Sequence, residues 1–299
     1  MFKRFFLFAV MNIAVIVTIS IVMNLLGVQP YLTAYGLNYE SLLIFCLLWG
    51  MIGSFISLMM SKFMAKKMMG VKVVEANSSY SHLVNTVHRL AKAANLPKMP
   101  EVGIYDSPEV NAFATGPSKS NSLVAVSTGL LNSMREDEVE GVLAHEIAHI
   151  ANGDMVTMAL AQGVINAFVM FFARVVAFAV QNALKSDDDK SPVGGLSYML
   201  TTIVFDILFG IIGSIILAGF SRYREFRADA GGASLAGKQS MINALKRLQM
   251  QYEGGGVFEN ENPSLNAFKI SSKESGLRAL LSTHPKLSDR IKRLELSRS

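Results

Sequence analysis

The sequence contains few cysteines and few charged residues, and each scarcity excludes a class of protein. Its single cysteine, Cys46, rules out an intramolecular disulfide framework and any zinc site built from two or four cysteines. Only 17% of the 299 residues are charged whereas 51% are hydrophobic, and the mean hydropathy of +0.35 is too high for an ordinary soluble enzyme. Polar low-complexity tracts are also missing, which excludes a disordered chain. The composition therefore predicts a membrane protein.

The net charge of +5 admits two interpretations. A basic protein can bind nucleic acid, whereas an excess of lysine and arginine in the loops of a membrane protein sets its orientation. The apolar composition favours the second interpretation, and we expect no nucleic-acid partner.

Four apolar stretches are long enough to cross a bilayer, which requires about 20 mostly apolar residues. They are 5–26, 41–61, 157–181 and 196–220. The first has no small-residue cleavage site, so we expect an anchor that stays attached to the chain. Residues 28–39 contain no lysine or arginine, whereas several lysines follow the second stretch. By the positive-inside rule, both termini and residues 62–154 are then cytoplasmic.

Two charged residues interrupt the last two apolar stretches. Arg174 and Asp206 each fall in mid-span, where a charge costs about 2.5–3.5 kcal/mol on insertion scales. We expect the two side chains to pair with each other. The alternative is that these helices lie on the membrane surface or line a cavity.

Outside the apolar stretches, the residue patterns predict a small mixed domain. Apolar spacing predicts a helix over 80–95, and residues 101–105 and 122–127 favour short strands with the segment 111–116 between them. A small sheet packed on helices is the expected result. Beyond the fourth stretch, 221–253 and 285–297 are expected to be helical.

The strongest motif is His145-Glu146-Ile147-Ala148-His149, an HExxH sequence. With so few histidines, a chance match is expected only roughly 0.004 times in a chain of this length. Ser133 and Glu136 are predicted to form a capping box ahead of the motif, and Asn152-Gly153 supplies a stop after it. The motif is therefore expected on a helix.

A helix places His145 and His149 on one face, because residues four apart differ by only about 40° in direction. Two imidazoles suit Zn²⁺, and a catalytic zinc site adds a third protein ligand and keeps one position for water. Glu146, next to the first ligand, is the natural general base for peptide-bond hydrolysis. The alternative is that both histidines simply pack within a core helix.

The third ligand must come from elsewhere in the chain, since no further histidine follows the motif at a metal-binding spacing. Glu225 and Asp229 stand four residues apart just after the fourth apolar stretch. We predict that Glu225 binds zinc and that Asp229 hydrogen-bonds a ligand imidazole. The alternative is a solvated pairing of these carboxylates with neighbouring arginines.

These motifs together resemble the HtpX-type membrane metalloproteases, heat-shock proteases of the bacterial inner membrane that are related to the CAAX prenyl endopeptidases. The resemblance rests on HEIAH followed by NGD, on REFRADAG, on NAFATG, and on a C-terminal THP with a downstream DRI. It covers nearly the whole chain, including the arrangement of the apolar stretches in two pairs. It implies one zinc ion per chain held by His145, His149 and Glu225, with catalysis by Glu146 and with Asp229 close behind the ligands.

The resemblance also implies roles for residues with weaker local signals. Asn111, Ala112, Phe113 and Ala114 would form an edge strand to which an extended substrate adds by main-chain hydrogen bonds, although an ordinary hairpin strand is the alternative. His284 would stabilise the oxyanion. Arg290 would orient His284 or the substrate. Quality control of misfolded inner-membrane proteins is the implied function.

The expected fold is a mainly α membrane protein. It has four transmembrane or membrane-associated helices and a cytoplasmic α+β zincin-like metalloprotease domain with a small sheet. The expected parts are a membrane anchor (1–61), a catalytic part with the sheet and the HExxH helix (62–154), a second membrane pair (155–220), and a helical part with the third ligand (221–299). Because the ligands lie close in sequence to apolar stretches, we expect the site within roughly 10 Å of the cytoplasmic membrane face, with membrane proteins as substrates.

Three other functions were considered. Residues 232–238 mimic a phosphate-binding loop, but Gln239 stands where serine or threonine must bind magnesium and no strand precedes, so we expect no ATP binding. A purely structural zinc site would need a fourth protein ligand, from Asp229 or His284. A transport function would use Arg174 and Asp206 as a buried pathway. The oligomeric state is left open.

Overall fold

The computed structural model describes residues 32–33, 36–184, 195–253 and 280–297. The apolar stretch 5–26, predicted to be the first membrane span, lies outside the described residues. The chain divides into two compact units. One contains residues up to Ser57 together with Ala159–Leu217, and the other contains Leu58–Met158 together with the chain from Ala218 onward.

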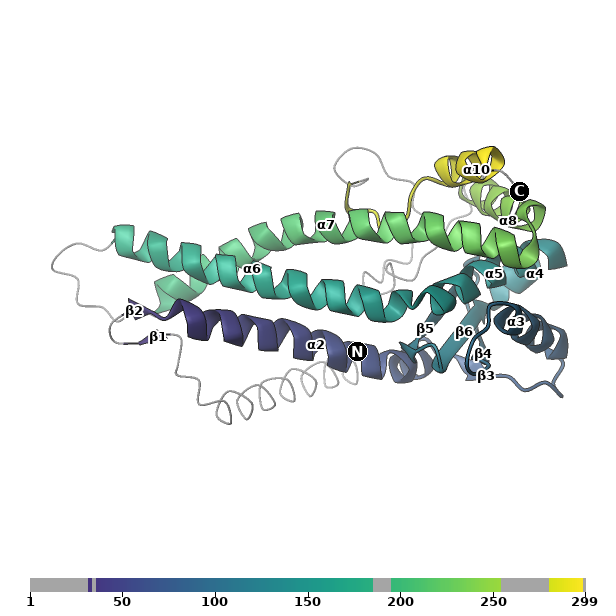
Figure 1. The fold of residues 1–299 in the computed structure, drawn as a ribbon, viewed down its shortest axis with the longest axis horizontal. Helices are drawn as coiled ribbons and strands as arrows, with labels where there is room; N and C mark the ends of the chain where they lie inside the picture. Colours follow the sequence, from purple (N-terminus) through teal and green to yellow (C-terminus); the bar gives the residue numbers. More distant parts are fainter. Residues whose placement is uncertain (1–31, 34–35, 185–194, 254–279, 298–299) are drawn as a thin grey trace. The chain divides into compact units, whose positions relative to one another are not determined.

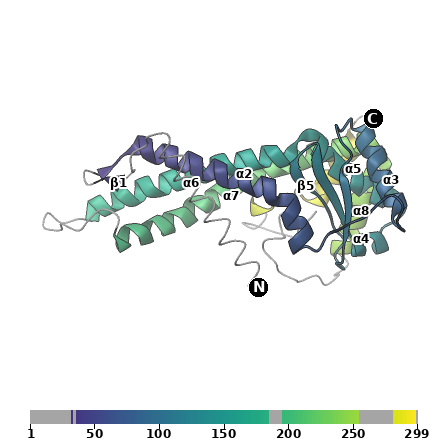
Figure 2. The ribbon, with the colours of Figure 1, turned by 90° about the horizontal axis from the view of Figure 1, so that it is seen from below.

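The first unit is built from long apolar helices. These are α2 (Tyr39–Met68), α6 (Asp154–Leu184) and α7 (Leu196–Ala236). One end of each helix belongs to the second unit. Each is long and apolar enough to cross a membrane, and they contain the second, third and fourth predicted spans. Figures 1 and 2 show the three helices running side by side. A two-stranded ladder of β1 (Leu32–Thr33) and β2 (Gly36–Leu37) precedes α2.

Glycine allows α2 and α6 to approach closely within this unit. A Cβ atom on Gly50 would collide with the carbonyl oxygen of Gly163, so only glycine fits at that crossing. Nearby, the lone cysteine Cys46 is buried against Leu42 and Ala167. The opposite faces of these helices expose large apolar side chains, as a lipid environment requires.

The charges of Arg174 and Asp206 meet, as the sequence predicts. Nη1 of Arg174 lies 3.8 Å from Oδ1 of Asp206 and also donates a hydrogen bond of 3.0 Å to the carbonyl oxygen of Met170. The two charges therefore compensate each other between α6 and α7.

Reversing either charge of this pair is expected to destabilise the membrane unit. Arg174→Asp or Asp206→Arg alone places two like charges together in an apolar segment, where one uncompensated charge costs about 2.5–3.5 kcal/mol. The double exchange should recover most of the loss in thermal unfolding midpoint, measured in detergent. A double variant no more stable than either single variant would show that the pairing does not stabilise the fold.

The second unit contains a mixed four-stranded sheet, which includes strands at the predicted positions 101–105 and 122–127 and an unpredicted one at Lys72–Val73. Its strands lie in the order β3-β4-β6-β5; β4 and β6 are parallel and the other pairs are antiparallel. The strands are β3 (Lys72–Val73), β4 (Glu101–Tyr105), β5 (Ala112–Ser118) and β6 (Asn121–Ser127). β5 therefore lies at one edge of the sheet.

Helices cover both faces of this sheet. One face carries the main core, to which α3 (Ser81–Ala93), α5 (Glu136–Asn152), α8 (Lys238–Glu253) and α10 (Leu287–Leu296) contribute. On the other face, Ala65 near the end of α2 packs with Tyr105 and Phe113. The apolar residues of the helix predicted over 80–95 are buried in the main core, as their spacing implies.

The start of α5 differs from the prediction. The capping box does not involve Ser133 and Glu136: Arg135 is the N-cap, and the Glu138 carboxylate accepts a hydrogen bond of 2.8 Å from the Arg135 backbone N–H. Ser133 instead ends a short preceding helix, α4 (Thr128–Ser133), which shifts the start of α5 by two residues. At the other end, Gly153 has the left-handed φ of 73° that terminates a helix, as predicted.

Residues 221–253 are helical, as the sequence predicts, but they are divided between two helices. α7 continues from its apolar part to Ala236, and Gly237, with φ of 90°, separates it from α8. Gly231 and Gly232, near the end of α7, are tolerated because they face α5 closely. A Cβ on Gly231 would lie 2.8 Å from the Ala148 side chain, and one on Gly232 would lie 3.1 Å from the backbone nitrogen of His145. This close contact sets α7 directly against the HExxH helix.

Candidate metal centre

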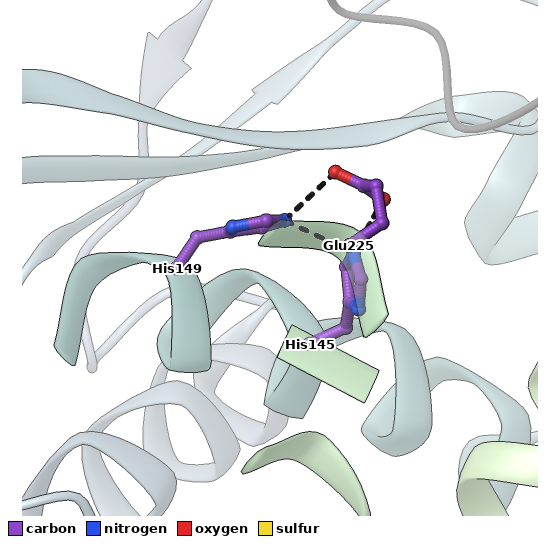
Figure 3. A group of neighbouring side chains, drawn as sticks. All are labelled: His145, His149 and Glu225. Carbon is purple, nitrogen blue, oxygen red and sulfur yellow. Dashed lines mark hydrogen bonds and ion pairs between the residues drawn. The ribbon is translucent and has the colours of Figure 1, made fainter. Parts of the chain in front are cut away.

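Two helices bring three metal-binding side chains to one point. α5 supplies His145 and His149, and α7 supplies Glu225, whose carboxylate faces both imidazoles in Figure 3. Nε2 of His149 is 3.3 Å from Oε1 of Glu225, and Nε2 of His145 is 3.4 Å from Oε2. The donor atoms of the three residues all lie within 4.8 Å of one another.

The chemistry of these atoms fits a divalent cation. The two Nε2 atoms are only 3.2 Å apart. Oε2 of Glu225 is buried and receives no well-directed hydrogen bond, although ring nitrogens of His145 and His284 lie within ion-pair distance. A cation placed among these three buried side chains would bind to both imidazole nitrogens and to the carboxylate at once. Two imidazole nitrogens and one carboxylate oxygen are a donor set typical of catalytic zinc.

The electrostatics of the site also favour positive charge at this point. Burial would lower the pKa of both histidines, but the carboxylates beside them outweigh it: the pKa of His145 is raised, and that of His149 is raised to about 10. Burial would raise the pKa of Glu225, yet the neighbouring His284 and His149 hold it well below its usual range. The carboxylates around His145 and His149 therefore stabilise positive charge beside these two imidazoles.

Asp229 lies next to His145. Its Oδ1 is 3.0 Å from Nδ1 of His145, so this imidazole turns Nε2 toward Glu225. Arg290 donates to both oxygens of Asp229, from Nη2 at 2.6 Å and from Nε at 2.8 Å. Burial would raise the pKa of Asp229, but Arg290 lowers it to about 2, which keeps the carboxylate ionised.

Arg290 comes from α10 and is completely buried. Besides Asp229, its guanidinium lies 3.6 Å from Oε2 of Glu225 and 3.4 Å from Nδ1 of His145. The resemblance left open whether Arg290 orients His284 or the substrate. Arg290 has no exposed surface, and the contacts above direct its donors at Asp229, Glu225 and His145, so its geometry favours holding these side chains.

His284 reaches the site from the segment before α10. Its Nδ1 is 2.9 Å from Oε2 of Glu225. Arg222, one helical turn before Glu225 on α7, donates from Nη1 to the carbonyl oxygens of Leu280 at 3.1 Å and Ser282 at 2.8 Å. Arg222 is one of the arginines of the alternative in which the carboxylates pair in solvent, and in the structure it holds the segment that carries His284.

Glu146 is buried beside the two histidines on α5. Burial raises its pKa, and the adjacent His145 and His149 only partly oppose this shift. The backbone of Ala114 in β5 forms a hydrogen bond to its carboxylate. A carboxylate with a raised pKa next to a metal site can both accept and return a proton, as a general base requires.

The residues predicted to bind substrate lie on or next to the edge strand β5. The Asn111 backbone N–H donates to Oγ of Ser127 at 3.1 Å, and Ala112 and Phe113 are buried. The Phe113 ring packs against Tyr105 with centroids 5.7 Å apart, so its side chain belongs to the core. β5 pairs with β6 as an antiparallel hairpin and packs against α5. The side chains of Ala112 and Phe113 are thus part of the core.

Comparison with known proteins decides the family. Residues 78–297 match peptidase family M48. The chain belongs to this family. Proteins described as "Protease HtpX homolog" are 52% identical in Methylacidiphilum infernorum and 49% identical in Bacillus subtilis, each over 99% of both chains. "Protease HtpX" of Chromohalobacter salexigens is 50% identical over 98% of both chains. These matches confirm the resemblance to the HtpX group, and the M48 chain is a membrane metallopeptidase that acts on peptide bonds.

A solved structure shows the same fold. The crystal structure of S. mikatae Ste24p superposes with a TM-score of 0.65 at 18% sequence identity. The match covers 98% of this M48 chain but only 65% of the Ste24p chain. The likeness therefore extends to the mostly helical architecture with its small mixed sheet.

Proposed function

We propose that this protein is a zinc-dependent, ATP-independent endopeptidase that cleaves misfolded or damaged proteins of the bacterial inner membrane at the cytoplasmic face. The observation that carries the proposal is the convergence of His145, His149 and Glu225 beside the buried carboxylate of Glu146. One zinc ion per chain would be held by these three ligands. M48 membership implies a metal.

The residues around the site would divide the work of hydrolysis. Bound zinc would polarise the scissile carbonyl and supply activated water. Glu146 would take a proton from the water and pass it to the leaving amine, for which its raised pKa is suited. His284 would stabilise the oxyanion, and the edge strand β5 would align an extended substrate by main-chain hydrogen bonds. Asp229 and Arg290 would hold His145 in place.

The apolar helices support membrane proteins as substrates. Three described helices are long and apolar enough to span, and Glu225 follows the predicted span 196–220 on the same helix by five residues. The lysines that follow the second predicted span support a cytoplasmic site. The division into parts 1–61, 62–154, 155–220 and 221–299, with four spans and both termini cytoplasmic, belongs to the same proposal.

ATP independence is supported by the segment that mimics a phosphate loop. Residues 232–236 continue α7 as a helix, and α7 rather than a strand precedes them. A phosphate loop needs successive backbone N–H groups free to turn toward one phosphate, whereas helical N–H groups are bonded within the helix. We propose neither a nucleotide nor a nucleic-acid partner.

Removing the metal is expected to abolish cleavage reversibly. Full-length protein in detergent, treated with a chelator, should lose cleavage of a membrane-protein substrate, and one equivalent of Zn²⁺ per chain should restore it without added ATP. Metal content by elemental analysis and product formation on gels are the measurements. The proposal fails if the chelated protein cleaves as before, if activity needs ATP, or if X-ray absorption finds four protein donors around zinc.

A further inference from the structure

The ligand His149 has a buried carboxylate of its own, to which neither the motifs nor the comparisons assign a role. Oδ2 of Asp154 lies 2.6 Å from Nδ1 of His149, and Asp154 is only 1% exposed. Its other oxygen, Oδ1, lies 2.7 Å from Nη2 of Arg227 on α7. We propose that Asp154, held by Arg227, is a positioning residue that fixes the imidazole of His149 for metal binding. This inference rests on the metal site of the proposed function.

The contact between Asp154 and His149 determines which ring nitrogen can bind a metal. A neutral imidazole carries its proton on one nitrogen and a lone pair on the other. A carboxylate oxygen only accepts, so it places the proton on Nδ1 and leaves the lone pair on Nε2. Nε2 of His149 is the atom that faces Glu225, at 3.3 Å from Oε1. Asp154 therefore selects both the tautomer and the ring orientation that the site requires.

The bend at Gly153 explains how Asp154 reaches the ring. In one continuous helix, a residue five positions after His149 would point roughly 140° away from it. Gly153 ends α5 in the left-handed conformation, with φ of 73°, and α6 begins at Asp154. The chain turns at this point, which brings the Asp154 carboxylate back under His149. The glycine predicted from sequence as a helix stop thus also builds the site.

Arg227 holds the second oxygen of this carboxylate. Arg224, one turn earlier on α7, adds a longer contact from Nη1 to the backbone oxygen of Asp154 at 3.4 Å. Ionised carboxylates are buried at acceptable cost when they are paired and hydrogen-bonded. The side chain of Arg227 is 47% exposed, but its Nη2 atom contacts a buried partner.

The site therefore contains two sets of contacting side chains, each made of a histidine, an aspartate and an arginine. His145 contacts Asp229, which is held by both donors of the fully buried Arg290. His149 contacts Asp154, which one donor of a half-exposed Arg227 holds. The second set is anchored less firmly than the first. Loss of either aspartate should loosen one ligand, and Asp154 is the one to which the sequence analysis assigns no role.

The inference is tested by the rate at which full-length protein in detergent releases zinc to a chromophoric chelator. Asp154→Ala should release zinc about 10–100 times faster than wild type, because outer partners of ligating histidines contribute that factor to metal affinity. Asp154→Asn keeps an acceptor oxygen, so its rate of zinc release should lie between those of wild type and Asp154→Ala. Arg227→Met leaves the carboxylate but removes its anchor, so it should accelerate release by a smaller factor. The visible spectrum of Co²⁺-loaded protein should change in the same order.

Thr157→Ala is the matched control. Thr157 is exposed in the same first turn of α6, and its hydroxyl bonds only to the carbonyl of Gly153, so zinc release should equal that of wild type. If Asp154→Ala does not fold, Asp154→Asn and Arg227→Met carry the test. Variants that melt at lower temperature but release zinc at the wild-type rate would make Asp154 a merely structural residue and overturn the inference. Wild-type protein that binds no zinc would instead refute the proposed function.

Discussion

Glu146→Gln is expected to abolish peptide cleavage while zinc stays bound. The amide has nearly the same shape as the carboxylate, and Glu146 is not one of the three groups that converge as ligands. The amide cannot accept a proton from water, however, and general-base catalysis contributes about 10²–10⁴-fold to rate. We expect a loss of this size in kcat for cleavage of a membrane-protein substrate, measured together with zinc content by elemental analysis.

Glu140→Gln provides the control for this substitution. Glu140 lies on the same helix α5, but it pairs with Arg89 at 2.9 Å near the surface, away from the histidines. The control variant should keep full activity and full zinc content. A Glu146→Gln enzyme that cleaves at the rate of Glu140→Gln would show that another group accepts the proton.

Glu225→Gln is expected to remove both metal and activity. The Glu225 carboxylate is the only one within ion-pair distance of both Nε2 atoms among the described residues, and its charge makes the pocket attractive to a cation. Without that charge, two imidazoles remain as weaker, neutral ligands. Activity should fall at least as far as in Glu146→Gln, by about 10²–10⁴-fold. Zinc content after dialysis should fall toward zero, which distinguishes this variant from Glu146→Gln.

The glutamine is preferred to alanine at this position for a reason of stability. Arg290 and His284 both face Oε2 of Glu225, and removal of one partner of a buried charge pair costs about 3–5 kcal/mol. The amide keeps the volume and an acceptor oxygen. Glu295→Gln, which opens only a surface pair with Lys246, should leave zinc, activity and melting temperature unchanged. Full zinc retention in Glu225→Gln would require a different third ligand.

The positions of the candidate ligands were predictable to an unusual degree. His145 and His149 share one helical face because that depends only on local helix geometry, and Gly153 stops the helix as its residue type implies. Glu225 and Asp229 were found from the same four-residue spacing together with the donor chemistry that zinc requires. The structure places all four side chains in one cluster. Their roles as ligands and supports remain predictions for the experiments above.

Contacts that depend on a particular turn or on distant segments escaped the sequence. Asp154 contacts His149 only because the chain bends at Gly153, and a helical projection would place it on another face. No local pattern indicates that Arg222 donates to backbone carbonyls 58 and 60 positions later in the chain. The capping box was misplaced because Ser133 belongs to the preceding short helix, which the local pattern did not reveal.

Residue chemistry and short-range periodicity were therefore sufficient for the described apolar helices, the HExxH helix and the reaction class, since each depends on residues a few positions apart. The meeting of α5, α7 and the segment before α10 required the folded chain. Gly231 and Gly232 allow two helices to touch, and buried Arg290 joins the C-terminal helix to the cluster. Such contacts link residues separated by many positions. They form only where the folded backbone brings helices close together and charged side chains pair, and no local sequence pattern indicates them.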